Sequence, residues 1–251
     1  MSNERLRSQI ISGGFTVEDL AEQLEVDPKT IERWITKERL PHRRHRWRTA
    51  ELLSCDEAYL WPQVADQPQT QEASRAELVA VYPHRGAVPA YLWQEFIDKA
   101  RTSVDILVYA GLFLVDNFPD LPSALATKAE RGARCRVLLG DPESDVVFQR
   151  GREEGIGENL AARIRLSRTY LTSEGPIPGL EIREHTSILY NSLYRFDDQL
   201  LVNMHVYGAP APHNPVMHLR RIPGGRLFDH YLAGFDRVWD GATPLADDAA
   251  A

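Results

Sequence analysis

The 251-residue chain is poor in cysteine and has no long apolar run. Its two cysteines, Cys55 and Cys135, are too few for a disulfide framework, and Cys135 lies in an apolar segment that suits a buried side chain. No apolar segment approaches the roughly 20 residues that a helix needs to cross a membrane. The charged start MSNERLRSQ lacks the apolar core of a signal peptide. We therefore expect a cytoplasmic protein that does not engage a membrane.

The chain also lacks an overall excess of positive charge. Its net charge of −7 argues against indiscriminate binding to polyanions. Residues 29–48 are the exception, because eight basic residues against two acidic ones leave a local charge of +6. A basic patch on an acidic protein is typical of a small module that contacts DNA.

A helix, a tight turn and a second helix are predicted near the amino terminus. Thr16 followed by Asp19 is typical of a capping box, and Asp27 with Pro28 suits the start of the next helix. Apolar residues recur at helical spacing in both segments, and they are Val17, Leu20, Ala21 and Leu24, then Ile31, Trp34 and Ile35.

The segment FTVEDLAEQLEVDPKTIERWITKERLP resembles helix-turn-helix domains of bacterial regulators of the XRE type. The shared features are the Leu-Ala helix, the short turn with an apolar residue, the DPKT start and the RW pair. The resemblance implies that the second helix enters the major groove of double-stranded DNA, with Lys29, Thr30 and Arg33 as the candidate contacts. The following PHRRHRWR segment suits phosphates or a minor groove. Its candidate residues are Arg43, Arg44, Arg46 and Arg48. The alternative is a helical protein-interaction module with a solvated basic loop.

Composition divides the chain into four parts. Residues 1–62 are predicted to form the helical DNA-binding domain, and the polar residues 63–77 a linker. Residues 78–242 alternate between helix and strand patterns, and residues 243–251 form a tail. The expected fold is therefore an α+β two-domain protein, with an all-α helix-turn-helix domain and an α/β sheet flanked by helices.

Three segments of the larger domain resemble the phospholipase D superfamily, and they occur in the family's order. They are WQEFIDKARTSVDILVYA, LPSALATKAERGARCRVLLGDPES and GRLFDHYLAGFDRVWDGA. Active members carry an HxKxxxxD motif, whose His is the nucleophile and whose Lys binds phosphate. Alignment on Asp197 places Tyr190 and Ser192 at those positions, and alignment on Asp198 places Asn191 and Leu193 there. The resemblance therefore implies a domain without the catalytic nucleophile, which is not an enzyme and needs no cofactor.

The predicted strands still carry many hydrogen-bonding side chains. Alternate strand residues share a face, which would group these side chains in one pocket. Such a pocket suits a small polar ligand that is sugar-, polyol- or nucleoside-like. Because superfamily members need two motifs, a single module also implies a homodimer. The candidate ligand-binding residues are Arg183, His185, Tyr190, Ser192, Asn203, His205 and Tyr207.

The favoured function is a ligand-responsive, DNA-binding transcription regulator whose sensor domain resembles an inactive phospholipase D. One alternative is a noncanonical phosphodiesterase or nuclease that uses His205 or His185. Another is a regulator whose larger domain only dimerises. The spacing of His185, His205, His213 and His218 matches no usual metal motif, so no metal is expected.

Overall fold

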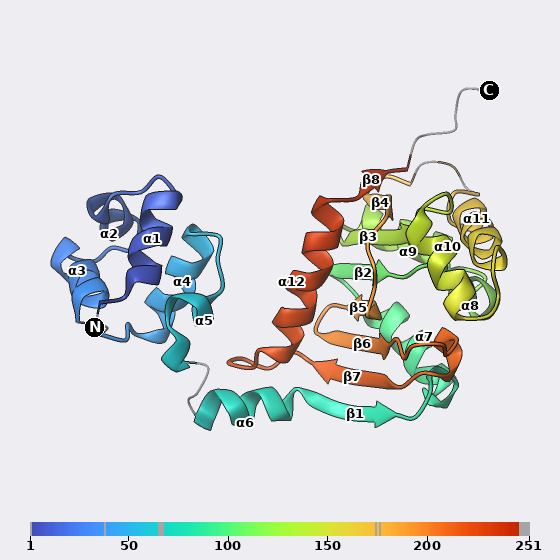
Figure 1. The fold of residues 1–251 in the computed structure, drawn as a ribbon, viewed down its shortest axis with the longest axis horizontal. Coiled ribbons are helices and arrows are strands. Elements are labelled where there is room, and N and C mark those ends of the chain that lie inside the picture. Colours follow the sequence, from blue (N-terminus) through green and yellow to red (C-terminus); the bar gives the residue numbers. More distant parts are fainter. Residues whose placement is uncertain (1, 38, 65–67, 174, 176, 246–251) are drawn as a thin grey trace. The chain divides into compact units, whose positions relative to one another are not determined.

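The structure is a computed structural model that describes all residues except 1, 38, 65–67, 174, 176 and 246–251. The chain divides into two compact units, residues 1–72 and 73–251, each with its own hydrophobic core (Figure 1). No helix in the described residues is long and apolar enough to span a bilayer.

The first unit is built from short helices around one core. The two predicted helices are present, and Thr16 and Asp19 form the expected capping box. The Asp27 carboxylate accepts a hydrogen bond of 2.8 Å from the Lys29 N–H, and Glu25 makes the turn with a φ of 55°. The helices are α1 (Glu4–Ser12), α2 (Val17–Gln23), α3 (Pro28–Thr36), α4 (Arg43–Leu52) and α5 (Glu57–Leu60).

Two segments of the sequence fold differently from expectation. The basic PHRRHRWR segment is not the solvated loop of the alternative interpretation, because most of it lies in α4, whose start is capped by His42. The predicted linker contains α6 (Pro68–Ala76), which begins with a proline, and Gln, Glu, Ala and Arg are good helix formers. Residues 65–67 of that linker lie outside the described residues.

The second unit contains one mixed, eight-stranded sheet in the order β1-β7-β6-β5-β2-β3-β4-β8. Strands β2, β3 and β4 are parallel to one another, and every other neighbouring pair is antiparallel. The strands are β1 (Leu78–Tyr82), β2 (Ser103–Leu107), β3 (Arg134–Gly140), β4 (Leu180–His185), β5 (Asn191–Phe196), β6 (Gln199–Met204), β7 (Val216–Arg220) and β8 (Thr243–Pro244).

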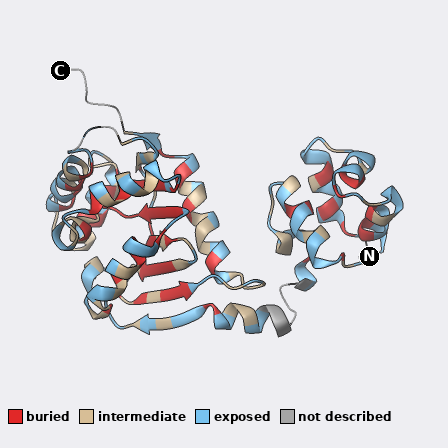
Figure 2. Cartoon of the chain, turned by 180° about the vertical axis from the view of Figure 1, so that it is seen from behind, coloured by how far each residue is buried: buried red, intermediate tan, exposed pale blue. Residues whose placement is uncertain are grey.

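Helices flank this sheet, as the sequence predicted. Buried residues concentrate in the central strands and on the inner sides of the helices, whereas β1 at the edge is largely exposed (Figure 2). The carboxyl ends of β2, β3 and β4 lie at the same end of the sheet as the start of β5. The helices are α7 (Ala90–Lys99), α8 (Leu112–Asn117), α9 (Leu121–Glu130), α10 (Asp145–Glu153), α11 (Asn159–Leu171) and α12 (Leu227–Asp240).

Candidate functional sites

The predicted recognition helix α3 has one face in the core and one in solvent. Ile31, Trp34 and Ile35 are buried, and this anchors the helix on the first unit. Lys29 and Arg33 are exposed, and Thr30 is half-buried. The three candidate contacts are therefore presented by a helix whose position is set by packing.

Helix α4 presents a second basic surface. Arg43, Arg44 and Arg48 are exposed, and the Trp47 side chain beside them is 60% exposed. Arg46 is different, because its Nε lies 2.6 Å from Glu57 and its Nη1 donates to the Pro41 carbonyl at 2.9 Å. The prediction that Arg46 contacts DNA is corrected on this basis, because its guanidinium binds α5 and the loop before α4.

Part of the predicted ligand set meets at the carboxyl end of the parallel strands. The Ser192 hydroxyl lies 3.1 Å from Nε2 of His205, and Nδ1 of His205 lies 3.2 Å from the Leu189 carbonyl. Since a carbonyl only accepts, Nδ1 carries the proton and Nε2 accepts from Ser192. Tyr109 stacks on the His205 ring at 5.9 Å and accepts a hydrogen bond from the Leu189 N–H.

Electrostatics keep this histidine neutral. Burial, assisted by the nearby Arg150 guanidinium, lowers the pKa of His205 to about 4. Arg150 is itself buried and paired with Glu154 at 2.7 Å. At neutral pH the group is therefore an uncharged imidazole between a hydroxyl and a carbonyl.

His185 lies next to the same tyrosine and is also held internally. Its Nε2 lies 3.1 Å from the Val108 carbonyl, and its Nδ1 accepts from the Ser187 N–H at 3.3 Å. Its ring lies 5.8 Å from that of Tyr109, and burial lowers its pKa. Both ring nitrogens are thus used by the backbone rather than directed at an open site.

The other predicted ligand residues do not join this cluster. Asn203 is fully buried and donates to the Asn214 and Pro215 carbonyls, so it fixes the loop that precedes β7. Arg183 stacks on Trp239 at 4.2 Å and donates to its carbonyl at 3.0 Å, which places its guanidinium on α12. The prediction of one pocket lined by all seven residues is therefore wrong. Alternation along a strand says which face a side chain is on, but not that α12 or the loop before β7 covers that face.

Tyr190 and Tyr207 are on the surface, with 79% and 84% of their area exposed. The backbone segments that carry them are adjacent, because the N–H of His205, two residues before Tyr207, donates to the Tyr190 carbonyl at 2.9 Å. Ile188 and Val206 are also exposed. We call these four residues the aromatic patch. An apolar cluster of this kind marks an interaction surface more often than a pocket for a polar ligand.

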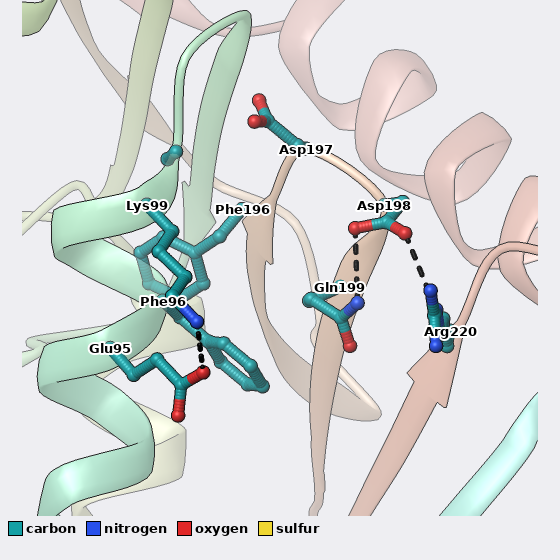
Figure 3. A pocket seen from close by; sticks show the side chains of 9 residues that line it. Glu95, Phe96, Lys99, Phe196, Asp197, Asp198, Gln199 and Arg220 are labelled. Carbon is teal, nitrogen blue, oxygen red and sulfur yellow. Dashed lines mark hydrogen bonds and ion pairs between the residues drawn. The ribbon is translucent and has the colours of Figure 1, made fainter.

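A cavity of about 350 Å³ lies at the β5–β6 hairpin, which is the opposite end of these strands from Ser192 and His205 (Figure 3). Sequence reasoning missed it, because its walls come from α7, the β5–β6 hairpin and β7, and α7, which ends at Lys99, is far in sequence from the hairpin that follows Phe196. Its lining residues are Glu95, Phe96, Lys99, Ala100, Phe196, Asp197, Asp198, Gln199 and Arg220. In the described residues no cluster of three or more His, Cys, Asp or Glu side chains is arranged to hold a metal ion.

Comparison with known families places a helix-turn-helix domain in the first unit. Residues 15–54 match the helix-turn-helix domain family, which spans α2, α3 and α4. Residues 75–170 match a domain family of unknown function, DUF5919. The predicted class, a helix-turn-helix domain joined to an α/β sheet domain, is thus confirmed.

Two solved structures are similar to the chain at low identity. One is TrmBL2, an archaeal chromatin protein with a novel mode of DNA binding, at 13% identity over 88% of this chain and 72% of that chain, with a TM-score of 0.42. The other is Nuc, a phospholipase D family member from Salmonella typhimurium, at 18% identity over 66% of this chain and 95% of that chain, with a TM-score of 0.37. No curated protein matches the chain.

Proposed function

We propose that this chain is a DNA-binding transcription regulator that reads duplex DNA with α3. The observation that carries the proposal is the pairing of a core-anchored helix with exposed basic residues in a helix-turn-helix domain. Residues on the exposed face at the start of such a helix reach base edges in the major groove. Arginine forms two hydrogen bonds with guanine, which makes Arg33 the main candidate for base recognition.

Helix α4 supplies contacts to the DNA backbone in this proposal. Arg43, Arg44 and Arg48 are exposed on one short helix, and Trp47 beside them offers a flat apolar surface to a sugar. Phosphate contacts position a protein on DNA and supply most of the salt dependence of binding. In this proposal α3 recognises the base sequence and α4 binds the DNA backbone.

The proposal is tested by binding to a randomised duplex library followed by gel shifts on the selected site. Arg33→Ala is expected to relax base preference and weaken specific binding by about 1–3 kcal/mol. Arg44→Ala is expected to weaken binding to all sequences and to reduce the salt slope by about one. Arg7→Ala, an exposed arginine on α1, is the matched control and should change neither. A library that yields no preferred sequence would contradict the proposal.

We infer that the second unit acts without hydrolysing phosphodiesters, and that it pairs two chains. Neither alignment on the phospholipase D motif, on Asp197 or on Asp198, supplies the nucleophilic His or the phosphate-binding Lys. The aromatic patch supports pairing, because two copies related by a two-fold axis would bury it against itself. A two-fold axis also matches two recognition helices to a palindromic site.

One contact favours a second candidate function, a noncanonical hydrolase. Ser192 and His205 lie within hydrogen-bond distance, and the Leu189 carbonyl orients the histidine. This is the arrangement of a nucleophile, a base and an orienting group. Two properties oppose it, because Ser192 is buried and an imidazole with a pKa of about 4 is a weak base at neutral pH. Phosphodiester or ester turnover that disappears in both Ser192→Ala and His205→Gln would establish the hydrolase.

A further inference from the structure

The cavity at the β5–β6 hairpin has an apolar floor. Phe96 of α7 and Phe196 at the end of β5 are both buried, and their ring centroids are 6.0 Å apart. Ala100 completes this floor without filling it. The cavity volume of about 350 Å³ is at the small end for a ligand site, which suits a molecule with a single ring or a short chain.

Charges of both signs lie on each side of this floor. On the α7 side, Lys99 Nζ lies 2.6 Å from Glu95, and on the strand side Arg220 Nε lies 3.5 Å from Asp198 (Figure 3). All four side chains are substantially exposed, so these pairs are weak and can exchange partners at little cost. Each side can therefore offer either a cation or a carboxylate to a molecule in the cavity.

The hairpin between the two sides is fixed before anything binds. The Asp197 carboxylate accepts hydrogen bonds from the N–H groups of Arg101, Thr102 and Ser103, so it faces away from the cavity. Gln199 donates to Asp198 at 3.0 Å, and its carbonyl oxygen lies 2.8 Å from Nε2 of the buried His218. A preorganised wall reduces the entropy cost of binding a small molecule.

We propose that this cavity binds a free amino acid, or a zwitterion of similar size, with an apolar side chain. Its carboxylate pairs with Arg220 or Lys99, its ammonium pairs with Asp198 or Glu95, and its side chain covers Phe96. A ligand with one charge would leave one side unmatched, and a sugar would leave both charged sides unmatched. The proposal rests on the proposed function only for its regulatory half, in which this ligand is the regulator's effector.

The regulatory half follows from where Arg220 lies. Its backbone N–H donates to the Glu77 carbonyl at 2.8 Å, and Glu77 is the residue that follows α6. The Glu77 carboxylate in turn accepts from the Leu227 N–H at 2.8 Å, at the start of α12. Ser74 of α6 accepts from the Arg226 N–H at 3.1 Å. Arg220 therefore belongs both to the cavity wall, through its side chain, and to the segment that follows α6, through its backbone. This shared residue is the route by which a bound ligand would be coupled to that segment.

The test uses the full chain, with L-phenylalanine and L-leucine as probes in titration calorimetry. We expect saturable binding that is at least about tenfold tighter than for 3-phenylpropionate or 2-phenylethylamine, which carry one charge each. Arg220→Gln and Asp198→Asn should each weaken binding about tenfold, whereas Arg237→Gln on the exposed side of α12 should not. Melting curves establish that each variant is folded. If one of Arg220→Gln and Asp198→Asn does not fold, the other still tests the proposal.

Separate gel shifts distinguish the two proposals. If none of the standard amino acids binds at ~1 mM while the chain still selects a DNA site, the cavity proposal is overturned and the proposed DNA-binding function is retained. If amino acids bind and no DNA site is selected, the ligand site stands and the regulator fails. If the chain binds both amino acids and a DNA site, L-phenylalanine should change the affinity for DNA in the wild-type chain but not in Arg220→Gln. An unchanged affinity in the wild type would overturn the regulatory half.

Discussion

At the scale of single residues, Asp105 is a charged residue within the buried strand β2, and two arginines compensate its charge. Its carboxylate is fully buried, and its neighbours in the sheet register are Arg136 on β3 and Arg195 on β5. Both guanidinium groups reach it, at 2.6 Å and 2.7 Å. Arg136 also pairs with Asp236 and stacks on Phe235, so this cluster holds α12 on the sheet.

Removal of the central carboxylate should therefore destabilise the second unit. Asp105→Asn leaves two nearly buried guanidinium groups without their charge partner, which costs about 3–5 kcal/mol. Asp236→Asn removes a half-exposed partner and should cost less than about 1 kcal/mol. Urea unfolding, followed by a signal from the second unit, compares the two variants. Equal losses would contradict a special role for Asp105.

His205 makes stability depend on pH. Its pKa is about 4 in the folded chain against about 6.5 when unfolded, so the unfolded state binds more protons between these values. The second unit should thus be most stable above pH ~6.5 and should lose up to about 3 kcal/mol as the pH falls toward 4. His205→Gln should flatten this dependence in urea unfolding at a series of pH values. A slope identical to that of the wild type would show that His205 is not the group responsible.

At the scale of elements, local signals predicted more than long-range ones did. The capping box at Thr16 and the Asp27-Pro28 start identified α2 and α3. The apolar runs VDILVYA and RCRVLLG are typical of buried strands, and they cover most of β2 and all of β3. Strand β1 was not identified, because its partner β7 lies far away in sequence. The candidate site failed for a related reason. Side chains alternate between faces only within a strand. Because β5 begins at Asn191 and β6 ends at Met204, the predicted site residues Tyr190, His205 and Tyr207 lie outside both strands.

Helix α4 contains both a structural arginine and candidate DNA-binding arginines, which sequence cannot tell apart. Arg46→Ala should lower the stability of the first unit by about 1–2 kcal/mol, because its largely buried pair with Glu57 and its bond to the Pro41 carbonyl are lost. Arg48→Ala should leave stability within about 0.5 kcal/mol and weaken DNA binding instead. Thermal melts and gel shifts on both variants separate these effects. If the two variants exchanged phenotypes, the assignment of α4 would be wrong.

At the scale of the whole molecule, the proposal requires two chains. Tyr190→Asp combined with Tyr207→Asp places charges in the aromatic patch and should yield monomers at micromolar concentration in light scattering. The monomer should bind a palindromic site less tightly, because each chain then binds without its partner. Tyr91→Asp, at an exposed tyrosine outside the patch, is the matched control. A wild-type chain that is monomeric at that concentration would contradict the pairing.

The position of β1 also has a consequence for biosynthesis. This strand is the first of the second unit to be made, yet it pairs with β7, which is made near the end. Until then it lacks a partner, and Leu78, Val79 and Val81 remain exposed even in the folded chain. The helical first unit depends on contacts nearer in sequence and should fold early, whereas the sheet must wait for nearly the whole chain. During synthesis the helix-turn-helix domain is therefore folded while the apolar strand β1 that follows it is still unpaired, and the yield should depend on chaperones.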